Sequence, residues 1–149
     1  MAETKKNQQA SIDCSDVKFG DEISCQLYSA IAEEKAEEIH GYSCNGEGER
    51  KFNKTTQVRR FYDEIAMWHE RVTRRPIAER EIFFQEVSPL IQMICAKAAY
   101  ARGRGLIEIN FYSLLATMIQ QVKSPKTLHQ AKLFFEAFIG FTKALENKK

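Results

Sequence analysis

The stretch that decides the fold is residues 55–72, "TTQVRRFYDEIAMWHERV". Its apolar and aromatic side chains recur every three or four positions, the period of one face of an α-helix. They are Val58, Phe61, Tyr62, Ile65, Trp68, His69 and Val72. Thr55 and Thr56 are candidate N-caps, and Pro76 breaks the chain after the stripe. The stripe is wide enough to be buried, so the segment predicts a long core helix.

Four further segments are predicted to be helical, and they cover residues 21–40, about 78–103, 106–122 and 125–145. The first is a thin amphipathic helix whose apolar positions are Ile23, Leu27, Ala30, Ile31 and Ile39. Pro89 is expected to kink or divide the second, because proline lacks the N–H that a helix interior needs. Before the last, Ser124 can cap and Pro125 suits the first helical position. Five helices without a convincing strand pair predict an all-α compact bundle.

The chain of 149 residues has the length of one domain. Residues 1–20 are polar and lack periodicity, so we expect a loose N-terminal tail before a single helical domain at 21–149. Residues 41–53 hold three glycines among polar residues and are typical of a loop. No apolar run approaches the roughly 20 residues that span a bilayer, and the N-terminus has no apolar signal segment. These features predict a cytoplasmic protein with no membrane partner.

Sequence motifs for catalysis are absent: the chain has no P-loop, GxGxxG, HExxH or GxSxG. His69 lies on the apolar stripe, where a hydrogen-bonded core histidine is expected, and His129 is expected at the surface or as a cap. Asp63 and Glu64 follow Arg59 and Arg60 by four residues, which favours surface ion pairs. The sequence therefore predicts a protein that is not an enzyme and needs no cofactor.

A zinc site made of Cys14, Cys25, His40 and Cys44 is the one metal site to consider. Structural zinc ligands usually come in close pairs, and only His40 and Cys44 are close here. Without an export signal the cysteines are expected to be reduced thiols, and no metal is predicted.

Charge is divided unevenly along the chain. Residues 1–53 carry six Lys or Arg and eleven Asp or Glu, whereas residues 54–149 carry sixteen and nine. The pI of 8.3 is below the value of about 9 that is typical of an obvious nucleic-acid binder. Charge alone therefore supports a polyanionic partner only weakly.

Two local clusters make the polyanion hypothesis stronger. Gln57, Arg59 and Arg60 lie off the buried stripe. Beside them Lys54, Thr55, Thr56 and Gln57 cluster at a predicted helix N-terminus, where free N–H groups and the helix dipole favour a phosphate.

The second cluster is "KAAYARGRG", residues 97–105, in which Lys97 and Arg104 share a helix face with Tyr100. Arg102 and Arg104 have a second explanation, because cations at a helix C-terminus complement the dipole and cap carbonyl groups.

Four stretches then suggest a family: "NKTTQVRRFYDEIAMWHE", "ICAKAAYARGRG", "FYSLLATMIQQV" and "LFFEAFIGFTKAL". In this order they resemble the small subunit of type III-A CRISPR effector complexes, over about residues 53–145. The matching positions are Thr55 and Thr56 before two arginines, then Lys97, Tyr100, Gly103 and Arg104, then Phe134, Phe135 and Ala137. Each motif is weak alone, but their ordered combination is fairly specific.

The resemblance implies a non-catalytic helical subunit that lines the duplex of guide RNA and target RNA in more than one copy. Its partners would be both RNAs, the other subunits and copies of itself, as a homodimer or a filament. The implied RNA contacts are Lys54, Thr56, Gln57, Arg59, Arg60, Lys97, Arg102 and Arg104. "ARGRG" adds Arg102 to the commoner single Gly-Arg ending, so either arginine can be the main phosphate contact. The alternative is a helical homo-oligomeric DNA-binding regulator, although no clear recognition helix follows a short turn.

Overall fold

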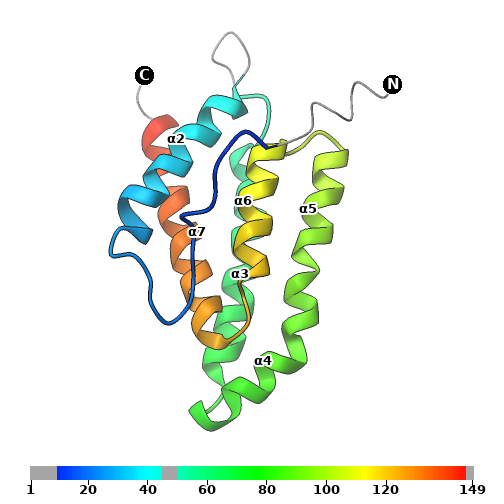
Figure 1. Cartoon of the computed structure of the whole chain (residues 1–149). Helices are drawn as coiled ribbons and strands as arrows, with labels where there is room; N and C mark the ends of the chain where they lie inside the picture. The colour runs from blue at the N-terminus through cyan, green and yellow to red at the C-terminus, as the bar shows by residue number, and fades with distance from the viewer. Residues whose placement is uncertain (1–9, 45–49, 147–149) are drawn as a thin grey trace.

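The computed structural model describes residues 10–44 and 50–146, and their regular structure is helical (Figure 1). A π-helical turn, η1 (Leu27–Ile31), runs into α2 (Ala32–Ser43), followed by α3 (Thr55–Arg74), α4 (Ile77–Gln92), α5 (Ile94–Gly103), α6 (Ile109–Gln120) and α7 (Pro125–Glu146). Across these residues the only β-pairing is an isolated bridge between Cys44 and Arg50. The predicted all-α bundle is confirmed.

α3 and α7 lie side by side, and α2 covers α7 on the other side, so α7 lies between the two. The predicted stripe of α3 is buried at Val58, Phe61, Ile65, Trp68 and Val72. Its neighbour on the stripe, Tyr62, is half-buried and meets the ring of Phe135 on α7, with ring centroids 5.8 Å apart. The helical period of one segment thus determined which face of α3 enters the core.

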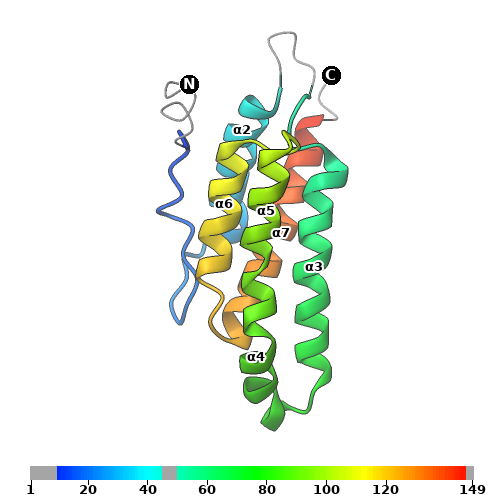
Figure 2. The same ribbon diagram turned by 90° about the vertical axis from the view of Figure 1, so that its right-hand side faces the viewer.

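Both proline signals act as predicted. Pro89 lies inside α4, which ends at Gln92, and α5 begins at Ile94 after the junction residue Met93. α4 and α5 therefore form a divided rod that runs past α3 (Figure 2). Pro125 is the first residue of α7, and the Ser124 hydroxyl oxygen accepts the Thr127 N–H at 3.2 Å.

The first predicted helix begins later than expected. Ile23 and Ala30 are exposed, and helical structure starts only at Leu27, which is buried. Leu27 and Ile39 enter the core as predicted, but the buried face also contains Lys35, whose ammonium group pairs with Asp16 at 2.9 Å. Because a charged residue occupies the buried face, the apolar spacing alone does not mark that face correctly.

Residues 10–20 differ from the loose tail that the sequence predicts. They have no regular secondary structure, yet Ile12 and Val17 are buried. The Asn110 side-chain oxygen accepts the N–H groups of Ser11 and Ile12 at 2.7 and 2.9 Å. Residues 1–9, the rest of the predicted tail, lie outside the described part.

Further along this segment, two glutamines hold its backbone by paired hydrogen bonds. Gln121 accepts the Phe19 N–H at 2.9 Å and donates to the Val17 carbonyl at 2.7 Å. Gln130 accepts from and donates to the backbone of Gly20, both at 2.8 Å. Residues 10–20 are therefore held against α6 and α7 by the side chains of Asn110, Gln121 and Gln130, which come about 100 positions later in the sequence.

None of the helices in the described part is long and apolar enough to cross a membrane.

Candidate nucleic-acid interface

A groove of about 500 Å³ separates α3 from α5; Figure 2 shows where these two helices lie in the bundle. α3 lines it with Gln57, Arg60, Phe61 and Glu64, and the α5 side contributes Ala96, Lys97, Tyr100, Ala101, Arg104 and Leu106. Along the helices most of these positions are either adjacent or three to four residues apart, so each helix presents one broad face to the groove. The N-terminal half of α3 and the length of α5 form its two walls.

The groove brings together four of the residues predicted to bind RNA: Gln57, Arg60, Lys97 and Arg104. Within the described chain, the Arg60 guanidinium makes no hydrogen bond or ion pair. The Arg104 guanidinium lies 5.7 Å from the centroid of the Tyr100 ring, and that ring is 68% exposed. Two cationic clusters from distant parts of the sequence therefore meet around one cavity.

Glu64 is the one acidic side chain that lines the groove. The sequence predicts a surface ion pair with Arg60, but Glu64 Oε1 instead pairs with the Lys97 ammonium group on α5. Its other oxygen, Oε2, is buried and has no hydrogen-bond partner in the described structure. No sequence signal links Glu64 to Lys97, because the two residues are 33 positions apart and meet only across the groove of the folded bundle.

The other four predicted residues do not line the groove. Arg59 points to the α7 side of α3, where it lines a smaller pocket with Arg50 and Lys143. Successive helical residues point about 100° apart, and the rotation of α3 in the bundle turns Arg60 to the α5 side and Arg59 to the α7 side. The Arg102 guanidinium lies 5.6 Å from the Tyr112 ring centroid on α6.

Lys54 and Thr56 are exposed at the start of α3. The prediction of Thr55 or Thr56 as N-cap is wrong: both lie inside α3, and the N-cap residue is Lys54, whose side chain makes no capping hydrogen bond. This leaves the first turn of α3 between the groove on one side and the Arg59 pocket on the other.

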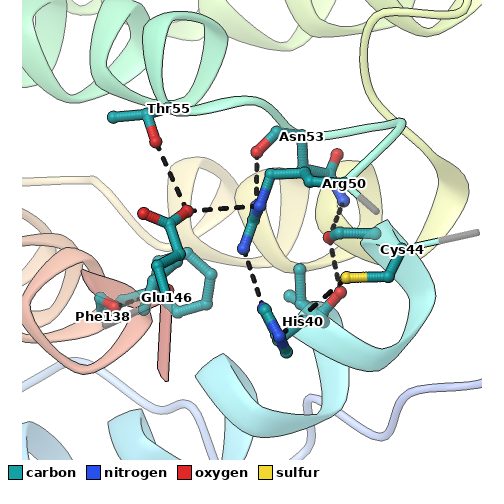
Figure 3. A network of polar contacts seen from close by, with 10 residues as sticks. His40, Cys44, Arg50, Asn53, Thr55, Phe138 and Glu146 are labelled. Carbon is teal, nitrogen blue, oxygen red and sulfur yellow. Dashed lines mark hydrogen bonds and ion pairs between the residues drawn. The ribbon is translucent and has the colours of Figure 1, made fainter. Parts of the chain in front are cut away.

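A network that the sequence did not predict fixes this end of α3 (Figure 3). The Arg50 guanidinium contacts His40 Nδ1 at 2.9 Å, donates to the Asn53 carbonyl oxygen at 2.7 Å and pairs with Glu146 at 3.2 Å. The Thr55 hydroxyl donates to the same Glu146 oxygen at 3.4 Å. The ends of α2, α3 and α7 are thereby tied to one another.

Asn53 holds the same region from inside the protein. It is fully buried and has φ of 55°, a left-handed conformation that asparagine tolerates. Its amide nitrogen donates to Ser43 Oγ at 2.8 Å and to Glu108 Oε1 at 3.2 Å, and its oxygen accepts the Glu108 N–H at 3.1 Å. Glu108 in turn caps α6 by accepting N–H groups of Asn110 and Phe111. Asn53 thus connects the start of α3 to the C-terminal end of α2 and to the N-terminal end of α6.

Among the four residues considered for zinc, the contact that the structure shows is between His40 and Cys44. Cys44 Sγ lies 3.9 Å from His40 Nε2, while the other ring nitrogen of His40 contacts Arg50. Cys25 is exposed, and burial raises the pKa of the half-buried Cys14 thiol. Over residues 10–44 and 50–146, no group of three or more His, Cys, Asp or Glu could hold a metal ion.

His69 and His129 form a pair at the other end of α3. Their rings stack with centroids 4.7 Å apart, and His129 Nδ1 lies 2.8 Å from His69 Nε2. Burial, together with the nearby charges of His129, Lys132 and Arg80, lowers the pKa of His69. The hydrogen bond expected for His69 is present, and exposed His129 is its partner.

A comparison with models of protein families shows to which family the chain belongs. The family model described as Csm2 Type III-A matches residues 31–148. The chain belongs to this family. It is therefore a structural small subunit of a type III-A CRISPR complex and associates with the complex's other subunits. No curated protein and no solved structure matches the chain.

The match to the Csm2 family spans α2 through α7 and so includes the groove. It extends further toward the N-terminus than the sequence motifs, which begin at about residue 53. The fastened segment at residues 10–20 precedes the match.

Proposed function

We propose that this Csm2-family chain binds the backbone of the duplex formed by guide RNA and target RNA in the groove between α3 and α5. The observation that carries the proposal is the meeting of Arg60, Lys97 and Arg104 around a single cavity. The subunit contributes binding and assembly to antiviral defence in the cytoplasm, and no catalysis. Lys54 and Thr56 extend the contact along the first turn of α3, and Arg59 supplies a cation on its other side.

Electrostatics support backbone binding without sequence readout. Guanidinium and ammonium groups bind phosphates well, and phosphate contacts carry no sequence information of their own. In RNA-guided complexes base pairing supplies the sequence, so the protein needs only to recognise duplex geometry and charge. Arg60 enters this interaction with its guanidinium unpaired, within the described chain, and loses no internal ion pair.

Each subunit contacts few phosphates, so binding by one copy is weak. Neighbouring copies and other subunits raise the effective concentration of each groove along the duplex. Copies of the chain that contact one another, as a homodimer or a filament, strengthen the interaction further. This accounts for a moderately basic chain in an RNA-binding role.

The test is charge reversal within the groove, with Arg60→Glu and Arg104→Glu measured by filter binding to guide–target RNA duplexes over a salt series. Each variant should weaken binding equally for unrelated sequences and lower the salt slope by about one unit for each phosphate that the protein no longer neutralises. Arg71→Glu is the matched control, because Arg71 is exposed near the far end of α3 and contacts the Trp68 ring. Unchanged affinity and slope for both groove variants would refute the proposal, and so would an equal loss for Arg71→Glu.

A further inference from the structure

Glu64 is chemically out of place in a groove that binds phosphates. The cations Arg60, Lys97 and Arg104 favour an anionic strand, whereas an ionised carboxylate repels it. An ionised carboxylate also only accepts hydrogen bonds, so phosphate oxygens cannot satisfy it. Its Oε2 atom is already buried without a partner in the described structure, which is costly for a charged acceptor.

The ligand that fits this arrangement carries hydrogen-bond donors beside its phosphates. In a paired strand each exocyclic amino group uses one N–H for pairing and keeps its other N–H inside a groove of the duplex, away from the phosphates. The ribose 2′-hydroxyl remains free, it lies next to the phosphate in the chain, and DNA lacks it. A carboxylate between cations therefore matches the alternation of phosphate and 2′-hydroxyl along RNA.

We propose that Glu64 accepts a hydrogen bond from a ribose 2′-hydroxyl and thereby gives the groove a preference for RNA. This inference rests on the proposed RNA-binding function of the same groove. The Lys97 side chain is about half exposed and turns from Glu64 to the incoming phosphate. Glu64 Oε1 then accepts the 2′-hydroxyl in place of the ammonium group, while Oε2 keeps its buried position.

The competing explanation is that Glu64 serves only as a counter-ion that holds Lys97 in place. The two roles respond differently to a change in the ligand. A counter-ion affects every polyanion alike, whereas an acceptor affects only ligands that carry the donor. The useful probe is a guide–target RNA duplex with 2′-fluoro groups on both strands, because fluorine removes the donor and retains the A-form sugar pucker.

The experiment compares the full chain with Glu64→Met and Asp63→Asn by filter binding to the hydroxyl and fluoro duplexes. The unaltered chain should bind the hydroxyl duplex about tenfold more tightly, as expected for loss of one hydrogen bond to a charged group. Glu64→Met, of similar size and without an oxygen, should bind both duplexes with equal affinity. Asp63→Asn removes the same charge at an exposed neighbouring position and should leave the tenfold ratio intact.

Two outcomes would overturn the inference while leaving the proposed function standing. In the first, the unaltered chain binds both duplexes equally, although Arg60→Glu still weakens both. In the second, Glu64→Met keeps the preference for the hydroxyl duplex, which would mean that another residue recognises it. If Arg60→Glu and Arg104→Glu have no effect on either duplex, the proposed function itself fails.

Discussion

Replacing Asn53 tests whether one buried amide holds the start of α3, and with it one wall of the groove. The residue is fully buried, has φ of 55° and makes three side-chain hydrogen bonds, to Ser43 and Glu108. Asn53→Ala removes all three bonds. It also places alanine in the left-handed region, which asparagine tolerates because its polar side chain can hydrogen-bond locally and alanine does not. Asn53→Gly removes the same bonds but adopts that conformation freely.

The magnitude follows from these two contributions. Each lost hydrogen bond costs about 1 kcal/mol, so removal of three reduces the free energy of unfolding by about 3 kcal/mol. The left-handed conformation adds about 1 kcal/mol for alanine. We therefore expect Asn53→Gly to lose about 3 kcal/mol and Asn53→Ala about 4 kcal/mol.

Urea denaturation followed by the fluorescence of Trp68, the single tryptophan, measures both values. The slope of the free energy against urea should stay the same, since the surface exposed on unfolding is unchanged. A loss below 1 kcal/mol for Asn53→Ala would refute the role of the hydrogen bonds. Equal stability of the alanine and glycine variants would refute the contribution of the backbone conformation.

Two further predictions concern the core and the histidine pair. Phe135→Ala removes a ring that packs against Tyr62, Phe111 and Phe138, and should lower the free energy of unfolding by about 3–5 kcal/mol in urea denaturation. The control Ile82→Ala, at an exposed position, should change the free energy of unfolding by less than about 0.5 kcal/mol. Similar losses for both variants would contradict the assigned core. Because the pKa of His69 is lowered in the folded state, the unfolded chain binds more protons as the pH falls through about 6.5, so stability should decrease from pH 7.5 to 5.5. The urea midpoint of His69→Gln should decrease less over this range, and an equal decrease would show that other groups control the pH dependence.

About half of the candidate site could be predicted from the sequence. The two cationic clusters and their helices were visible, because helical period and capping signals depend on neighbours within a few positions. Whether Arg59 or Arg60 faces α5 depends on how α3 is rotated against its neighbours. The stripe of α3 excludes both from the core but does not say which one meets Lys97 and Arg104.

The sequence by itself determined the long buried face of α3, the division of the α4–α5 rod shortly after Pro89 and the start of α7 at Pro125. Each depends on short-range backbone chemistry or on a repeated apolar spacing. Only the tertiary structure decided that Glu64 meets Lys97 and that residues 10–20 are fastened by Asn110, Gln121 and Gln130. These contacts join polar groups from distant parts of the chain, and such pairs leave no periodic pattern because their partners meet only after the helices have packed.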